Sequence, residues 1–239
     1  MRVMVASYGL LESFALGAIA QSSLLFAGLF VCWVKVPKRL VGLLAGFGAG
    51  ALIASVSFDL IDEASSLSSV ELAVWMLIGA TIFIAGDRLV ETRFGSEGTG
   101  GAMGIIVGSV VDGVPESIIF GIQIATGFPV SASFLASVWV SNIPQAMAPS
   151  ADLADSGWSR RRLGTLWCEV VLACGVAAAI GYAFATIVAD AGGARIAALA
   201  AGGILSMLTT SLMPFSWQRG GQLAGAATVV GFCLALSAT

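Results

Sequence analysis

Eight long apolar runs, joined by short polar segments, constrain the fold of this chain more than any other feature. They cover residues 8–34, 40–61, 71–92, 102–124, 130–153, 163–188, 195–215 and 220–238. Each has roughly the twenty residues that a helix needs to cross the hydrocarbon core of a bilayer. The chain is 58% hydrophobic and only 10% charged, which is far more apolar than a soluble domain. We therefore expect one all-α integral membrane domain over residues 1–239, with eight transmembrane helices.

The basic residues predict how these helices are oriented. If the amino terminus lies outside, the inner loops contain Lys35, Lys38, Arg39, Arg88, Arg93, Arg160, Arg161, Arg162 and Arg219. Nine of the eleven basic residues then lie inside, so the positive-inside rule favours this orientation for a multi-pass protein of the cell membrane. Both termini lie outside, because an even number of spans returns the chain to its starting side. The basic clusters are interpreted as topology determinants, so no nucleic-acid partner is expected.

Two of the runs carry the same polar signature around a proline. Residues 112–116 read Asp-Gly-Val-Pro-Glu, and residues 141–145 read Ser-Asn-Ile-Pro-Gln. A proline inside a helix cannot donate to the helical ladder, so Pro115 and Pro144 each release a backbone carbonyl beside these polar side chains. The first and last residues of each motif are four apart and share one helix face. Two such faces turned toward each other predict an oxygen-lined cation site.

The acids of the first motif have no basic neighbour at the same depth. Asp112 and Glu116 lie near the middle of their span, where each charge costs about 2.5–3.5 kcal/mol on insertion scales. Every lysine and arginine falls in a joint or at a span end. The countercharge must then come from a bound cation, bound protons or water. The alternative is that both carboxyls are protonated and hydrogen-bonded across helices.

Other polar residues complete the predicted site. The predicted metal ligands are Asp112, Glu116, Ser141, Asn142, Gln145 and Glu169. Glu169 either reaches the same cavity or is an interfacial acid that pairs with the arginines at 160–162. An entrance or exit path is predicted from Asp59, Asp62, Asp87 and Asp152, although any one of them can equally be a solvated span end. The chain has no histidine, and an all-oxygen site favours Mn²⁺, Mg²⁺ or Ca²⁺ over Zn²⁺ without excluding zinc.

The second and seventh runs match each other. Residues 48–60 align with residues 200–212, small residues on small ones and apolar on apolar. With the orientation above, the two segments cross the membrane in opposite directions, as an inverted-topology transporter repeat requires. The alternative is that a composition rich in glycine and alanine produces such a match in any membrane chain.

The proline motifs resemble those of the ZIP family of divalent metal transporters. The family's fourth span carries a His-Asn-x-Pro-Glu-Gly type motif and its fifth a His-x-x-Pro-Glu type motif, to which residues 112–117 and 141–146 are similar. The resemblance continues through residues 46–50, Glu169 and the closing Gly231-Phe232, and covers nearly the whole chain. It implies a ZIP-like inverted repeat of spans 1–3 and 6–8 around central spans 4–5. It also implies a homodimer and an elevator-like transport unit that slides against a scaffold.

This chain departs from the family at several ligand positions. By the resemblance, Asp112 and Ser141 stand where the family has histidines, Gly113 stands for an asparagine, and Glu116 is the retained glutamate. Gln145 stands where a glutamate bridges two metals, so a two-metal zinc site of the family type is not expected.

The expected function is import of a divalent cation into the cytoplasm, with zinc, manganese, iron, magnesium and cadmium not distinguished. The alternative is a ZIP-fold membrane protein without metal transport that acts as a sensor, regulator or partner-binding module. An enzyme is not expected: a histidine-dependent protease is excluded by composition, and the Gly-x-Gly-Asp context of aspartyl membrane proteases is absent.

Overall fold

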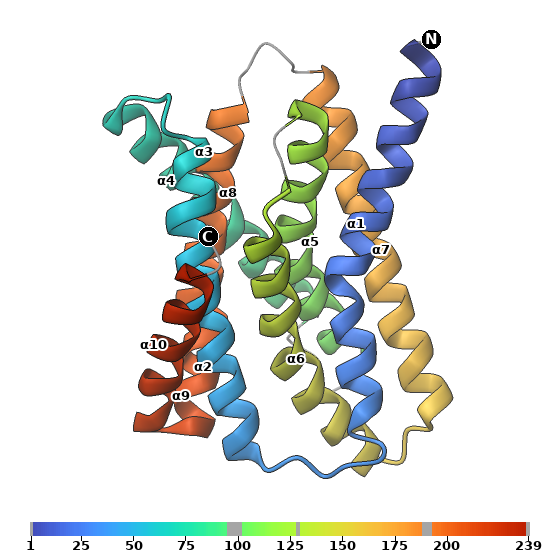
Figure 1. The fold of residues 1–239 in the computed structure, drawn as a ribbon. Helices are drawn as coiled ribbons and strands as arrows, with labels where there is room; N and C mark the ends of the chain where they lie inside the picture. Colours follow the sequence, from blue (N-terminus) through green and yellow to red (C-terminus); the bar gives the residue numbers. More distant parts are fainter. Residues whose placement is uncertain (1, 95–101, 128–129, 188–192, 238–239) are drawn as a thin grey trace.

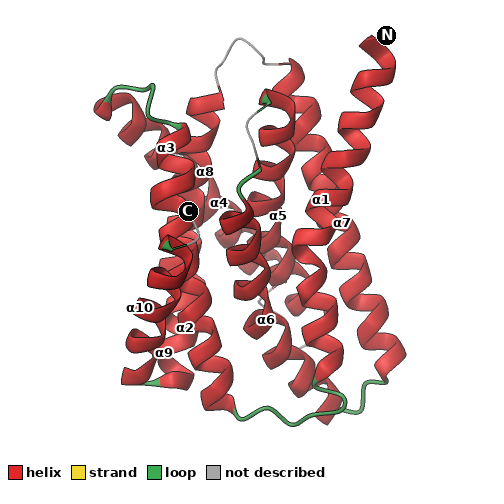
Figure 2. Cartoon of the chain, in the orientation of Figure 1, coloured by secondary structure: helices red, strands yellow, loops and turns green. Residues whose placement is uncertain are grey.

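The computed structural model describes residues 2–94, 102–127, 130–187 and 193–237, and within these ranges it contains helices and no strand (Figures 1 and 2). The elements are α1 (Arg2–Phe30), α2 (Lys38–Ser55), η1 (Val56–Leu60), α3 (Ile61–Glu63), α4 (Ser69–Phe94), α5 (Ala102–Thr126), α6 (Ala132–Asp155), α7 (Arg160–Ile187), α8 (Gly193–Met207), η3 (Leu208–Leu212), α9 (Met213–Gly220) and α10 (Gln222–Leu236). The segments η1 and η3 are π-helical and interrupt two otherwise continuous helical runs. The all-α prediction is confirmed.

Five helical runs among the described residues are long and apolar enough to cross a membrane. They are Gly9–Phe30, Lys38–Glu63, Ser69–Leu89, Arg160–Thr186 and Gly193–Gly220. Large apolar side chains lie exposed on their flanks, among them Leu11 and Leu77, which are 65% and 68% exposed. Lipid, unlike water, accommodates such surface. The architecture is therefore compatible with a helical membrane protein, while the count of eight spans stays a prediction.

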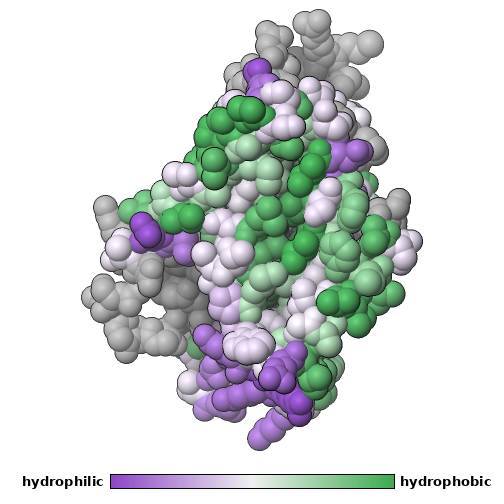
Figure 3. Space-filling view, turned by 90° about the vertical axis from the view of Figure 1, so that its left-hand side faces the viewer, coloured by the Kyte–Doolittle hydropathy of each residue, from purple (hydrophilic) through white to green (hydrophobic). Residues whose placement is uncertain are grey.

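Basic and aromatic residues gather at one end of the bundle. The α1–α2 connection, the start of α7 and α9 lie together at the lower end of Figure 1, and Figure 3 shows hydrophilic surface there below an apolar flank. The Arg160 guanidinium lies 4.9 Å from the centre of the Trp33 ring, and that of Arg162 lies 3.7 Å from the Trp158 ring. Stacked Arg–Trp pairs of this kind suit a membrane–water interface, where a ring is partly buried and the cation stays hydrated.

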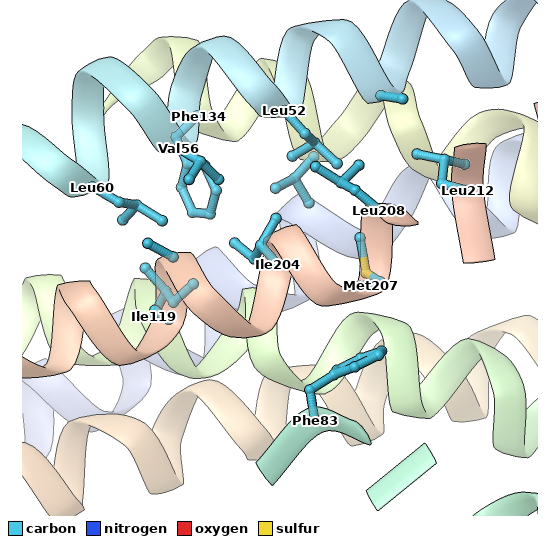
Figure 4. Close-up of a cluster of buried hydrophobic side chains, with 14 of the residues drawn as sticks. Leu52, Val56, Leu60, Phe83, Ile119, Phe134, Ile204, Met207, Leu208 and Leu212 are labelled. Atoms are coloured by element: carbon cyan, nitrogen blue, oxygen red, sulfur yellow. The ribbon is translucent and has the colours of Figure 1, made fainter. Parts of the chain in front are cut away.

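The core lies where α2 and η1 face α8 and η3 (Figure 4). Three fully buried side chains, spaced four residues apart, come from each segment: Leu52, Val56 and Leu60 from the first, and Ile204, Leu208 and Leu212 from the second. Each residue of the first set precedes its counterpart by 152 positions. Phe83, Ile119 and Phe134 pack around them from α4, α5 and α6.

Glycines allow two pairs of helices to approach closely. A Cβ on Gly50 of α2 would collide with the backbone of Thr228 in α10, and one on Gly202 of α8 would collide with the backbone of Met76 in α4. The reciprocal contacts are those of Gly231 with Phe47 and of Gly79 with Leu199. Each residue in the α2–α10 contacts corresponds to a residue in the α4–α8 contacts whose number differs by 152. The two helix pairs therefore pack by the same device.

We predict that Gly50→Ala destabilises the protein, because the new methyl group meets backbone that cannot rotate away. Overpacking of this kind costs about 1–3 kcal/mol, so the midpoint of thermal unfolding in detergent should fall by several degrees. Gly225→Ala is the matched control, since a Cβ there meets no atom within 4 Å, and alanine is the better helix former. Equal effects of the two changes would contradict the packing argument.

Candidate functional site

A chain of three buried polar side chains joins α1, α5 and α6. Gln21 Nε2 donates a hydrogen bond to Glu116 Oε2 at 3.1 Å, and Asn142 Nδ2 donates to Gln21 Oε1 at 2.8 Å. Gln21 is 0% exposed, Glu116 1% and Asn142 2%. We call this group the central cluster. It brings together the glutamate of the first proline motif and the asparagine of the second.

Glu116 is incompletely satisfied within this cluster. Its Oε1 atom is buried and has no hydrogen-bond partner among the described residues. The salt bridge formed within the described ranges, Arg195 to Glu71, involves other residues. Burial of an ionised carboxylate without a partner is strongly unfavourable. The Glu116 carboxyl must therefore bind a proton or share its charge with a cation.

Small residues let the helices come close enough to form the cluster. A Cβ on Gly113 would lie 3.2 Å from Gln21 Oε1 and 2.9 Å from the Sγ atom of Cys174, so glycine leaves room for both groups against α5. Gly48 of α2 plays the same part on the other side, where a Cβ would lie 2.6 Å from the Cα atom of Ser141. The proline motif thus positions its polar residues within a tightly packed bundle.

The remaining predicted ligands of the two motifs lie around the central cluster. Asp112, half-buried and one helical turn from Glu116, accepts a hydrogen bond at 3.4 Å from the Ser211 hydroxyl of η3. Ser141 is buried, and its hydroxyl donates to the carbonyl of Val138 at 2.9 Å. Gln145 is half-buried. Pro115 and Pro144 both lie inside continuous helices, as predicted.

Glu169 does not join the other predicted ligands. Its side chain is exposed and lines a shallow surface pocket with Trp158, Arg161 and Arg162. The interfacial interpretation of this acid therefore fits the structure, and the prediction that it reaches the central cavity does not. Among the described residues, no group of three or more His, Cys, Asp or Glu side chains is placed to hold a metal ion. Any cation at the centre must use amide, hydroxyl or backbone oxygen as well.

A row of hydroxyl groups on α6 leads away from the centre. Ser133, Ser137 and Ser141 are spaced four residues apart, so they share one face, which packs against α2. The Ser133 hydroxyl donates to Asp59 Oδ2 at 2.8 Å, and the hydroxyls of Ser137 and Ser55 are 3.0 Å apart. Gln145 lies one turn beyond Ser141 on the same face. We call Ser133, Ser137 and Ser141 the serine row.

The four acids predicted to mark a path lie in different surroundings. Asp59 is half-buried in η1, whereas Asp62 is exposed in the next turn. Asp87 is half-buried in α4. Asp152 is exposed and lines a cavity of about 260 Å³ at the basic end of the bundle, together with Lys35, Lys38, Met147, Asp155 and Arg219 among others. This inner cavity carries both signs of charge, and acids alone do not define it.

A second cavity lies where α5 faces α4 and α8. It measures about 440 Å³ and is lined by residues of α4, α5 and α8, among them Phe83, Pro115 and Ile119. Its lining is almost wholly apolar, and it includes none of the central cluster. It therefore has no donor or acceptor chemistry for an ion.

The sequence interpretation overlooked Gln21 and Ser211. Gln21 is uncharged and lies in the first apolar run, ahead of two serines, so it does not stand out from ordinary polar residues of a membrane helix. The available signal is its size, because it is the one large polar side chain of that run between Glu12 and Lys35. Ser211 lies in the segment that aligns with Asp59, and that alignment was available without a structure.

No protein-family model matches this chain, and no curated protein matches it. The assignment of a function therefore depends on the geometry described above.

We predict that Gln21→Leu destabilises the protein, because it removes the donor to Glu116 and the acceptor for Asn142 while both stay buried. An unsatisfied buried group costs about 1–3 kcal/mol, so thermal unfolding in detergent should occur at a clearly lower temperature. Gln218→Leu, at an exposed position of α9, is the matched control. The double variant Gln21→Leu/Glu116→Leu should lose less than the sum of its two single variants. Additive losses would show that the hydrogen bond contributes nothing.

Proposed function

We propose that this protein is a ZIP-like membrane transporter that moves a divalent metal cation into the cytoplasm, with the central cluster as the transit site. One observation carries the proposal: the Glu116 carboxyl is buried among membrane-type helices, has a free oxygen, and is not paired with any described basic residue. Intramembrane acids without a cationic partner commonly mark ion or proton pathways.

The ligand chemistry favours a hard cation. The groups near the centre are the carboxylates of Glu116 and Asp112, the amides of Gln21 and Asn142, and hydroxyls. Oxygen ligands suit Mn²⁺ and Mg²⁺ better than Zn²⁺, which prefers imidazole and thiolate. The metal is the cargo, so a site with few strong ligands is compatible with release.

We also propose an inverted repeat that relates α1, α2 and α4 to α7, α8 and α10. It is supported by the buried aliphatic residues of the core, the glycine contacts and the two π-helical segments, which all recur after 152 positions. α2 and α8 run in opposite directions in Figure 1. In this proposal the chain crosses the cell membrane eight times, and the basic end faces the cytoplasm.

The packing suggests which parts move. α1, α5, α6 and α7 pack against one another, and α2 packs on α10 and α4 on α8. The contacts of α6 with α2 and of α5 with α8 join the two groups. We assign the first group to an elevator-like transport unit and the second to a scaffold that also forms a homodimer. The inner cavity adjoins Met147 of α6, five residues beyond Asn142, and would be the exit to the cytoplasm.

The second candidate is a membrane protein of the same fold that transports no metal and serves as a sensor, regulator or partner-binding module. It is favoured by the tight burial of the central cluster and by the exposed position of Glu169. In that case Glu116 is a protonated group within a structural hydrogen-bond network.

We predict that Glu116→Ala abolishes uptake of Mn²⁺ into vesicles that contain the purified protein. The alanine removes the one fully buried carboxylate of the central cluster. Glu169→Ala is the control, because it removes an exposed carboxylate and should leave uptake near that of the parent protein. Manganese entry is followed with a fluorescent indicator inside the vesicles. Uptake that survives Glu116→Ala, or is lost equally in both variants, would exclude the assigned site.

Restoring the metal ligands of the ZIP motifs should alter selectivity. The triple variant Asp112→His, Ser141→His and Gln145→Glu is expected to shift preference from manganese toward zinc, because imidazole is the softer ligand. Competition between the two ions in the same uptake measurement gives the ratio, which should move at least tenfold. An unchanged ratio would contradict the ligand argument.

A further inference from the structure

A second polar group lies at the opposite end of the bundle from the basic loops. The Gln123 amide of α5 donates from Nε2 to Glu63 Oε2 at 3.3 Å, and Ser133 of α6 donates to Asp59 Oδ2 at 2.8 Å. Ser131 and Ser133 are within hydrogen-bonding distance of each other, at 2.7 Å. We call these residues the outer cluster. Its side chains come from η1–α3 and from the end of α5 and the start of α6, which follow η1–α3 by about 60 residues or more.

Gln123 has an orphan oxygen at this position. The side chain is 2% exposed, and its Oε1 atom has no hydrogen-bond partner among the described residues. The nitrogen of the same amide is held by Glu63, so the amide group lies against that carboxylate. A buried acceptor without a donor is energetically unfavourable. An oxygen of this kind next to carboxylates is the arrangement that a cation satisfies.

The outer cluster also has unbalanced charge. Asp59 and Glu63 are four residues apart and repel each other electrostatically. No lysine or arginine of the described ranges pairs with either, and Arg195, which lies at the start of α8, is bound to Glu71 at 2.9 Å. A cation held between the carboxylates would remove the repulsion and supply the missing partner for Gln123.

We propose that the outer cluster is a binding site for a hard divalent cation, with Asp59, Glu63 and Gln123 Oε1 as ligands and the serine hydroxyls as further oxygens. Carboxylate, amide and hydroxyl oxygens are the ligands of Ca²⁺, Mn²⁺ and Mg²⁺. The site is distinct from the central cluster, since Gln123 follows Glu116 by seven residues, about 10 Å along α5. It binds a cation whether or not the protein transports one.

The serine row connects the outer cluster to the central cluster. Ser133 belongs to the outer cluster, Ser137 follows one turn along α6, and Ser141 precedes Asn142. Hydroxyl groups one turn apart provide successive oxygen contacts for a cation that moves from the outer cluster to the central cluster. If the protein transports metal, the outer cluster is therefore where the ion loses its first waters.

The test measures Mn²⁺ binding to the full-length purified protein in detergent, from the loss of the free-ion signal in electron paramagnetic resonance. Glu116→Gln is the background, because it weakens the central cluster and leaves the outer cluster intact. In that background we expect one saturable site, and the added changes Asp59→Asn and Glu63→Gln should each weaken it at least tenfold. Asp62→Asn is the matched control, because Asp62 is an exposed acid of the same helical run and should have no effect.

A variant that binds Mn²⁺ more tightly provides a test that misfolding cannot imitate. Gln123→Glu adds a third carboxylate at the position of the orphan oxygen, so it should bind Mn²⁺ at least tenfold more tightly and should gain more thermal stability from the ion than the parent does. The proposal is overturned if Glu63→Gln binds like the parent, if Asp62→Asn weakens binding as much, or if Gln123→Glu binds no better. Binding at this site without any uptake into vesicles would refute transport and leave the outer site in place.

Discussion

The buried carboxyl of Glu116 is the constraint on which the centre of this structure depends. A charge at that depth is costly, and the described residues provide no cation to balance it. What they provide instead is an amide, Gln21, which satisfies one oxygen and is itself held by Asn142. Because each of the three side chains comes from a different helix, their hydrogen bonds fix how α1, α5 and α6 pack. Gly113 allows the same arrangement, because a larger residue at this position would push Gln21 away from α5.

The same packing device occurs twice in the bundle, and in each case a π-helical segment holds a polar residue. Asp59 in η1 accepts a hydrogen bond from Ser133 of α6, and Ser211 in η3, 152 positions later, donates one to Asp112 of α5. A π-helical turn places an extra residue in the helix and rotates the side chains that follow, which is why such turns often occur at functional sites. An inverted repeat, as we propose, would place one such contact toward each side of the membrane and the central cluster between them.

Sequence periodicity was enough to predict the helices but not every member of the site. The apolar runs coincide with helical runs because a chain in lipid must satisfy its backbone hydrogen bonds internally, which leaves few alternatives. Glu116 and Asn142 were identified since charge and proline make them conspicuous. Gln21 was missed because a lone amide has many roles in a membrane helix, and Glu169 was misplaced because its helix face could not be inferred from its depth. Which face a residue presents depends on how helices rotate against one another, and residues such as Gly17 and Gly175 on α1 and α7 determine that rotation through packing.

The two polar clusters differ in a way that bears on how an ion would move between them. The outer cluster has two partly exposed carboxylates, so a hydrated cation can reach it with little loss of water. The central cluster is nearly inaccessible, and its single fully buried carboxylate is already engaged by an amide. In the proposed transport, an ion arriving there would either share the free oxygen of Glu116 or displace the Gln21 donor, and displacement would break the hydrogen bond that joins α1 to α5. Under that proposal, the same hydrogen bond would couple occupancy of the centre to relative movement of these helices, as alternating access requires.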